Sequence, residues 1–261
     1  MGNLDDRIAV VTGGATGIGL ATARRLACQG ATVVMAGRDA RRGEAAAEAI
    51  RGSGGRATFI AADVTDDSQV AVLAKRAAGE QDAIDIWFNN AGIEGGLGPL
   101  AAFDDLTVRQ LLDTNIKGVY SGMRYAAEHM RGGGVIINNA SFVGTVLPAP
   151  VAVAYGATKA AVVSMTRAAA LALADQGIDV FAVAPYFIDT PMIDRLTGFQ
   201  GPEPKAAFAA QFNPSGKLAA PEDVAQVVVA LATRTSPYHS GDVLLVDTGP
   251  SVTIMSSASS N

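Results

Sequence analysis

Short apolar runs alternate along this chain with longer stretches of helical pattern, and this alternation limits the folds that are open to it. The runs IAVV at 8–11, ATVVMA at 31–36 and DVFAVA at 179–184 are almost wholly apolar, as expected of strands that are covered on both faces. Strands that alternate with helices form right-handed crossovers and a parallel sheet. The pattern therefore predicts an α/β fold, a doubly wound parallel sheet of about seven strands with helices on both faces.

The order of these elements indicates one domain that spans residues 1–261, because no internal repeat or charged linker divides them. We expect strands at 8–11, 31–36, 57–62, 84–88, 135–139, 178–184 and 243–246, and helices at 17–29, 39–51, 66–79, 104–131 (as two stretches or one bent helix), 155–175 and 221–234. Residues 186–217 contain four prolines and no clear strand. A connection of that length in a compact domain is usually a lid or binding loop, so we predict that it covers the substrate.

The residue types that are scarce in this chain argue against several classes of function. The net charge is −5 and no basic run occurs, which makes a nucleic-acid partner a poor guess. Cys28 is the only cysteine and only two histidines occur, so neither a disulfide nor a metal site is expected. The N-terminal residues lack the features of a signal peptide, and no run of about 18 apolar residues occurs. We expect a soluble cytoplasmic protein without a membrane partner.

A glycine-rich turn, TGGATGIG at 12–19, joins the first expected strand to the first expected helix. It matches neither the G-x-G-x-x-G fingerprint nor a P-loop. Its glycines still allow the backbone to approach a pyrophosphate closely, and the helix that follows offers free N–H groups and a positive dipole end. The alternative is a tight turn that serves only helix–strand packing.

The residues after the second strand bear on which dinucleotide would bind. An acidic residue at this place accepts hydrogen bonds from ribose hydroxyls, whereas an arginine accommodates a 2′-phosphate. Position 37 is glycine and Arg38 follows it, which favours NADP(H). Asp39 either caps the next helix or reaches the ribose, and in the second case NAD(H) is possible.

Polar residues also follow the third and fourth strands, at the edge where open parallel sheets bind ligands. Asp63 would accept from an adenine amino group; alternatively, Asp63 or Asp66 only caps the next helix. Asn89 and Asn90 stand in tandem just before Ala91-Gly92. Asparagines after a strand often only make a turn, but two together at this edge favour a role in shaping a cofactor site.

Tyr155 and Lys159 stand four residues apart in YGATK, and Ser141 lies fourteen residues upstream. The spacing places both side chains on one face of a helix. An ammonium beside a phenol favours the phenolate, so we expect the pKa of Tyr155 to fall from about 10 toward working pH. Such a tyrosine exchanges a proton with a carbonyl or alcohol oxygen. A tyrosine and a lysine four residues apart often occur by chance and are then usually exposed to solvent. Together with the glycine-rich turn, the pair indicates a hydride-transferring enzyme.

Together, these motifs resemble those of the short-chain dehydrogenase/reductase family over residues 5–249. TGGATGIG is similar to the family's T-G-x-x-x-G-I-G, NNAG at 89–92 is identical to its sheet-stabilising motif, and YGATK matches Y-x-x-x-K. Asn115 and Ser141 complete the resemblance to the family's catalytic tetrad. The resemblance implies a Rossmann-like fold and an NADP(H)-preferring oxidoreductase that exchanges hydride between the nicotinamide and a carbonyl or secondary alcohol. A non-catalytic dinucleotide-binding sensor or scaffold is the alternative.

The resemblance also implies roles for the matching residues. Tyr155 would act as general acid or base, and Lys159 would lower its pKa and hold the nicotinamide ribose. Ser141 would orient the substrate oxygen, and Asn115 would hold a water through its backbone. Cofactor contacts are expected at Gly13, Thr16, Gly17, Ile18, Gly19, Arg38, Asp63, Val64, Asn90, Ala91, Gly92, Tyr155, Lys159, Pro185, Ile188 and Thr190. Substrate contacts are expected at Ser141, Phe142, Tyr155 and Tyr186.

The substrate and the subunit contacts are less constrained. Pro185-Tyr186 stands where the family commonly has Pro-Gly, so we expect Tyr186 to narrow the pocket or contact the substrate. Apolar residues in 93–98, 142–150 and 186–217 predict a hydrophobic or alicyclic substrate and no charged clamp. Alanines in helices 104–131 and 155–175 suit a homotetramer or homodimer, as in the family, unless they pack on their own sheet. Residues 252–255 would cover a neighbouring subunit.

Overall fold

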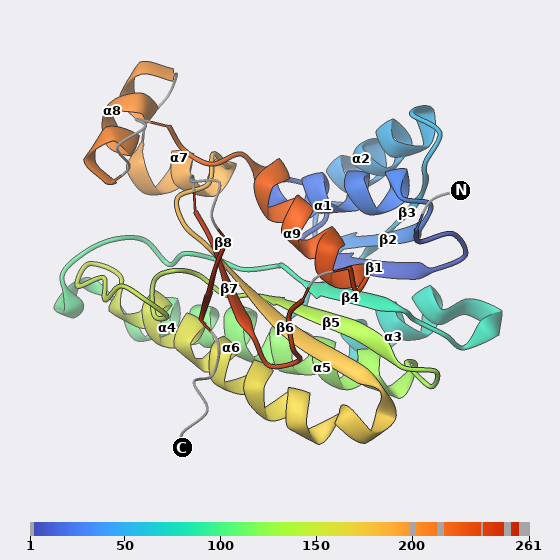
Figure 1. Ribbon diagram of the computed structural model, residues 1–261. Helices are drawn as coiled ribbons and strands as arrows, with labels where there is room; N and C mark the ends of the chain where they lie inside the picture. The colour runs from blue at the N-terminus through green and yellow to red at the C-terminus, as the bar shows by residue number, and fades with distance from the viewer. Residues whose placement is uncertain (1–2, 199–201, 213–216, 236, 248–251, 256–261) are drawn as a thin grey trace.

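The computed structural model describes residues 3–198, 202–212, 217–235, 237–247 and 252–255, in which eight strands form a single sheet (Figure 1). The strand order is β3-β2-β1-β4-β5-β6-β7-β8. The strands are β1 Ile8–Thr12, β2 Thr32–Gly37, β3 Arg56–Ala61, β4 Ile86–Asn89, β5 Gly134–Asn139, β6 Ile178–Pro185, β7 Val243–Val246 and β8 Val252–Met255. β1 to β7 run parallel, which confirms the predicted doubly wound sheet.

The central strands are apolar because both of their faces are covered. Along β1, Ala9 and Val11 point into one core while Val10 points into the other, and all three side chains are fully buried. Alternate residues of a strand project to opposite faces, so an unbroken apolar run supplies both cores at once. The short runs in the sequence therefore predicted the strands to within about two residues at each end.

Helices cover both faces of the sheet (Figure 1). One face carries α1 Gly17–Cys28, α2 Ala40–Gly52 and α9 Pro221–Ala232; the other carries α3 Asp67–Ala78, α4 Asp105–Leu112, α5 Gly118–Glu128 and α6 Val153–Ala172. Short 3-10 turns occupy Gly79–Gln81, Leu100–Ala102 and Ala174–Gln176. No helix in the described part of the chain is long and apolar enough to cross a bilayer.

Two of the aspartates considered above cap helices. The Asp39 carboxylate accepts a hydrogen bond from the backbone N–H of Arg42 at 3.0 Å, so Asp39 is the N-cap of α2. Asp66 caps α3 and accepts from the backbone N–H groups of Ser68 and Gln69. These hydrogen bonds, led by the one from the Ser68 side chain, lower the pKa of Asp66 to about 2.

A π-helical turn, Asp113–Lys117, joins α4 to α5 in one continuous helical stretch. This agrees with the expectation of either two helices or one bent helix over 104–131. A π-turn adds one residue to a helical turn, and such insertions are frequent at functional sites. Here the turn holds Asn115, which is fully buried.

The segment 186–217 holds two helices, α7 Pro191–Thr197 and α8 Pro202–Phe212, which stand beyond the carboxyl ends of the strands (Figure 1). The prolines concealed them, although proline is well suited to the first position of a helix. Lys205 on α8 lies 2.6 Å from the Asp189 carboxylate and 2.7 Å from that of Asp194, so it ties α8 to α7.

The strand β8 is the one element of the sheet that the sequence did not predict. It pairs antiparallel with β7, from Val243 opposite Met255 to Val246 opposite Val252. We had predicted that this stretch contacts a neighbouring subunit, and did not predict that it pairs with a strand of its own chain. Residues 256–261 are rich in serine, a composition that predicts a frayed end, and they lie outside the described residues.

Candidate active site

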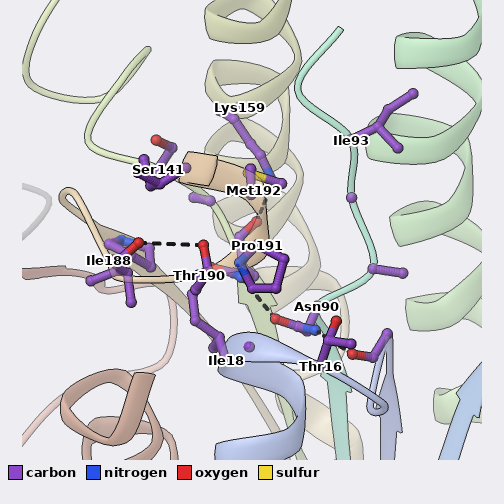
Figure 2. A pocket seen from close by; sticks show the side chains of 18 of the residues that line it. Thr16, Ile18, Asn90, Ile93, Ser141, Lys159, Ile188, Thr190, Pro191 and Met192 are labelled. Atoms are coloured by element: carbon purple, nitrogen blue, oxygen red, sulfur yellow. Dashed lines mark hydrogen bonds between the residues drawn. The ribbon is translucent and has the colours of Figure 1, made fainter. Parts of the chain in front are cut away.

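A cleft at the carboxyl ends of the strands gathers most of the predicted site residues (Figure 2). Its lining includes Gly13, Thr16, Gly17, Ile18, Asn90, Ala91, Gly92, Ser141, Tyr155, Lys159, Pro185, Tyr186, Ile188 and Thr190. Six predicted residues are not part of this lining: Gly19, Arg38, Asp63, Val64, Asn115 and Phe142. The cleft therefore joins the glycine-rich turn to the Ser141–Tyr155–Lys159 group, as the sequence predicted.

The glycine-rich turn leaves room for a phosphate at the start of α1. Gly13 has φ +64°, and a Cβ there would lie 2.9 Å from the Asn90 amide nitrogen. A side chain at Gly19 would collide with the carbonyl oxygen of Gly13. The N-terminus of α1 has no side-chain cap and no acidic residue in its first turn. Unpartnered N–H groups at a positive dipole end suit a pyrophosphate, so this part of the cleft fits a dinucleotide.

A chain of hydrogen bonds connects this turn to Lys159. The Asn90 side-chain amide donates to the carbonyl oxygen of Thr12 at 2.9 Å, and the Thr12 hydroxyl accepts from the backbone N–H of Asn90 at 3.0 Å. The Asn139 amide donates to the Asn90 side-chain oxygen at 3.0 Å. Lys159 Nζ in turn donates to the carbonyl oxygen of Asn139 at 2.7 Å, as the dashed lines of Figure 2 show. The turn and the lysine are therefore held in a fixed relation.

Lys159 is a buried cation with few partners. Its side chain comes from the middle of α6, and the residue is 4% exposed. Burial lowers the pKa of Lys159 to about 8, because removing an ammonium from water disfavours its charged form. A lysine with this pKa can lose its proton near physiological pH.

The pKa of the Tyr155 phenol differs from the one that the sequence predicted. Its pKa is raised to about 12, first by burial; a hydrogen bond with Ser141 works in the opposite direction, and the Glu94 carboxylate adds to the rise. Lys159 Nζ lies 5.6 Å from the centre of the tyrosine ring. The predicted fall of the Tyr155 pKa was wrong, because burial of the phenol disfavours its charged form and outweighs the hydrogen bond from Ser141. At neutral pH, Tyr155 is a proton donor.

Ser141 is buried at the end of β5, beside Tyr155. Its hydroxyl oxygen accepts a hydrogen bond from the backbone N–H of Val143 at 3.2 Å. The hydroxyl hydrogen is a separate donor, and the serine can aim it at an oxygen in the cleft.

Asn115 lies beneath the cleft and acts on the loop after β4 through its side chain. Its amide oxygen accepts from the N–H of Ile93 at 2.9 Å, and its amide nitrogen donates to the carbonyl oxygen of Ile93 at 2.9 Å. The same nitrogen donates to the hydroxyl of Thr158 at 3.1 Å. The Asn115 side chain thus links the loop after β4 to α6. The sequence had predicted only that the Asn115 backbone holds a water.

The predicted adenosine end lies along β2 and β3. Arg38 is exposed, and its guanidinium has no hydrogen bond or ion pair with any described residue. The Asp63 carboxylate accepts from the N–H of Thr65 at 3.0 Å and from its hydroxyl at 2.9 Å. Val64 is nearly buried, against Gly118 of α5.

The substrate end of the cleft is aromatic but also charged. Tyr186 packs against Phe142 with ring centres 4.2 Å apart, and Phe187 joins both. Arg195 of α7 lines the cleft and pairs side-on with Glu94, at 2.7 Å from Nε and 3.2 Å from Nη2. Arg195 therefore adds a charge to a lining that the sequence predicted to be largely apolar and without a charged clamp.

Two of the residues that sequence reasoning missed are Asn139 and Arg195. Asn139 stands in the polar run NNAS, which begins at the end of the fifth strand and was a usable signal. Arg195 and Glu94 are 101 residues apart, and nothing local to either residue indicates the pairing.

Comparisons with known proteins agree with this geometry. A family model described as Enoyl-(Acyl carrier protein) reductase matches residues 13–251. Cis-4-hydroxycyclohexanecarboxylate dehydrogenase from Sinomonas cyclohexanicum is 41% identical over 94% of this chain and 96% of its own. 3beta-hydroxysteroid dehydrogenase 1 from Eggerthella lenta is 37% identical over 95% and 94%. The crystal structure of levodione reductase superposes with a TM-score of 0.86 at 32% identity, over 94% of this chain and 97% of the other.

These matches extend over nearly the whole chain and include the turn and the cleft described above. The chain belongs to the short-chain dehydrogenase/reductase family, and is an NAD(P)-dependent oxidoreductase of hydroxyl and carbonyl groups.

Proposed function

We propose that this enzyme reduces an alicyclic ketone, or oxidises the matching secondary alcohol, with NADP(H) as the preferred cofactor. The observation that carries the proposal is the Ser141–Tyr155–Lys159 group in the same cleft as the uncapped start of α1. The cofactor supplies or accepts the hydride. Everything else in the reaction is positioning and proton transfer by the chain itself.

In the reductive direction, we assign the proton transfer to Tyr155. As hydride reaches the carbonyl carbon, negative charge develops on the oxygen, and the Tyr155 hydroxyl donates its proton there. The Ser141 hydroxyl donates a hydrogen bond to the same oxygen and stabilises that charge. A pKa of about 12 keeps Tyr155 protonated and ready for this step at neutral pH. In the oxidative direction the same tyrosine must first lose its proton.

Lys159 and Asn115 are proposed as supporting residues. The Lys159 ammonium would hold the nicotinamide ribose hydroxyls, with its position set by the carbonyl oxygen of Asn139. Asn115 would keep the loop after β4 in place through Ile93. At the nicotinamide end, Pro185, Ile188 and Thr190 line the cleft and would complete the site.

The NADP(H) preference rests on the end of β2. Arg38 is exposed and has no partner among the residues that the structure describes, while Asp39 is engaged as the cap of α2. A free guanidinium there suits a 2′-phosphate, and an occupied carboxylate is less suited to ribose hydroxyls. Asp63 and Val64 would border the adenine.

Three relatives support a cyclic substrate, since their names refer to a hydroxycyclohexanecarboxylate, a hydroxysteroid and levodione. The Tyr186 ring lines the cleft, is held by contacts with the rings of Phe142 and Phe187, and suits a cyclic substrate. The matched family model is described as an enoyl reductase, but the four-residue spacing of Tyr155 and Lys159 is closer than such reductases use. We also propose that 186–217 acts as the lid of one domain over residues 1–261.

We further propose a homodimer or homotetramer in the cytoplasm. A groove between α5 and α6 is lined by Tyr120, Met123, Arg124, Ala127, Glu128, Met165, Ala168, Ala169, Ala172, Leu173 and Gln176. The exposed Tyr120 ring and small alanines there suit close packing with the same helices of a second subunit.

The test is NADPH and NADH oxidation with a panel of cyclohexanones, for the wild type and for Arg38→Ser. We expect turnover with NADPH preferred, and a loss of about 10- to 100-fold in that preference in the variant, since a charge-assisted contact is removed. Arg76→Ser, an exposed arginine on α3, is the matched control. Tight cofactor binding without turnover of any ketone would instead favour the sensor alternative.

A further inference from the structure

We propose that Arg195 recognises a carboxylate on the substrate, so that the enzyme prefers a keto acid or hydroxy acid to the neutral ring of the same shape. This inference rests on the proposed function and narrows its substrate class. It depends on three features: the position of Arg195, the donors that its ion pair leaves free, and the surroundings of Glu94.

Arg195 is placed to meet a substrate. It lies on α7, within the proposed lid, and lines the same cleft as Ser141, Tyr155 and Tyr186. Its side chain is 58% exposed, so the guanidinium is not enclosed by protein. Among the other lining residues Lys159 is the only further cation, and Lys159 is directed at Asn139.

The ion pair with Glu94 uses only one edge of the guanidinium. Nε donates to one carboxylate oxygen at 2.7 Å and Nη2 donates to the other at 3.2 Å. A guanidinium has five N–H donors, so both hydrogens of Nη1 and the second hydrogen of Nη2 remain. No other hydrogen bond of Arg195 is found in the described part of the chain. That free edge has the fork geometry that binds a second carboxylate through two N–H groups.

Glu94 serves to hold Arg195 in this orientation. Its side chain is only 14% exposed, and its carboxylate is near enough to Tyr155 to raise the pKa of the phenol. The pair therefore lies close to the proton donor of the reaction. A side chain that is already ordered loses less entropy on binding, which makes the held guanidinium a better receptor than a free one.

The experiment compares 4-oxocyclohexanecarboxylate with its methyl ester, which has the same ring but no charge. We expect the wild type to favour the acid over the ester in kcat/KM by about 10- to 100-fold, through KM. Arg195→Met should abolish that preference and leave the ester's kcat/KM within about threefold, because only a charge contact is lost. Arg195→Lys should keep part of it, since the charge remains and the fork is lost.

The variant Glu94→Gln distinguishes recognition of a substrate carboxylate by Arg195 from a role of the ion pair in the structure alone. It removes the negative charge but keeps the shape and one oxygen that accepts from the guanidinium, so the acid preference should persist. If the ion pair only holds the lid, Arg195→Met and Glu94→Gln should instead impair acid and ester alike. Arg109→Met, which removes an arginine paired with Asp105 at 2.6 Å on the exposed side of α4, is the matched control and should keep the wild-type ratio.

An acid-to-ester ratio near one in the wild type would overturn the proposal while leaving the proposed function intact. Equal losses with both substrates in Arg195→Met and Glu94→Gln would also overturn it. If neither ketone is reduced with either cofactor, together with the rest of the cyclohexanone panel, the proposed function itself fails.

Discussion

The proton donor is the residue on which the proposed chemistry depends most. Tyr155→Phe removes one hydroxyl from the cleft and keeps the ring, so cofactor binding should change little. We expect kcat for ketone reduction to fall by about 100- to 10,000-fold, the usual contribution of a general acid. Tyr125→Phe, whose hydroxyl donates to Asp67 at 2.6 Å between α5 and α3, is the control. Turnover that survives in Tyr155→Phe would refute the assignment.

The titration of Lys159 predicts how the reaction depends on pH. Below a pKa of about 8 the side chain is an ammonium, and above it the charge is lost. We therefore expect kcat/KM for ketone reduction to decline as the pH rises through about 8, while Tyr155 is still protonated. Lys159→Arg keeps its charge at all these pH values, so its residual activity should show no such decline. An unchanged decline in that variant would assign the titration to another group.

Individual site residues were predictable where the signal is local. The spacing and chemistry of Tyr155, Lys159 and Ser141 are visible within one or two elements, so the sequence grouped three residues that the structure brings into one cleft. The pKa of Tyr155 was not, since it depends on how deeply the phenol is buried. The pairing of Arg195 with Glu94 was also out of reach, because their contact depends on how α7 packs against the loop after β4.

Among the elements, α5 packs closely against a buried polar network of β4 and β5 that a single methyl group would disrupt. Trp87 donates to the Asn89 oxygen at 2.7 Å, and Asn89 donates to Asn138 at 2.9 Å. A Cβ at Gly122 would collide with that Asn89 oxygen. We expect Gly122→Ala to lower the free energy of unfolding by about 1–3 kcal/mol, despite the better helix propensity of alanine.

The measurement is urea unfolding, with Gly52→Ala as the comparison. Gly52 ends α2, and a Cβ there would meet nothing within 4 Å. That variant should be as stable as the wild type or slightly more so. Equal stability of the two variants would mean that α5 moves away from the network at little cost.

The elements themselves followed closely from the sequence, with two instructive exceptions. The apolar runs and alanine-rich helices carry their own periodicity, so β1 to β7 and most helices were placed within a few residues. The helices α7 and α8 were missed because four prolines suggested irregular chain, although Pro191 and Pro202 start helices here. β8 was missed because its pairing with β7 is tertiary information.

For the whole molecule, the groove between α5 and α6 predicts how subunits associate. Ala168 is exposed in that groove, and a carboxylate there would have to be buried in a dimer. We expect Ala168→Glu to shift the enzyme toward a smaller oligomer in sedimentation velocity. Val72→Glu, at a residue of α3 that is 54% exposed, should leave the sedimentation coefficient unchanged. A wild type that sediments as a monomer would contradict the proposal directly.

The π-turn at Asp113–Lys117 interrupts a regular α-helix at the residue that holds the loop beside the cleft. Its extra residue gives the backbone a poorer hydrogen-bond geometry than an α-helix, yet it presents Asn115 to the loop that borders the cleft. Deleting one residue there would restore an ordinary helix and rotate the asparagine by about 100° away from Ile93. A change that makes this helix more regular would therefore also remove the contact between Asn115 and the loop.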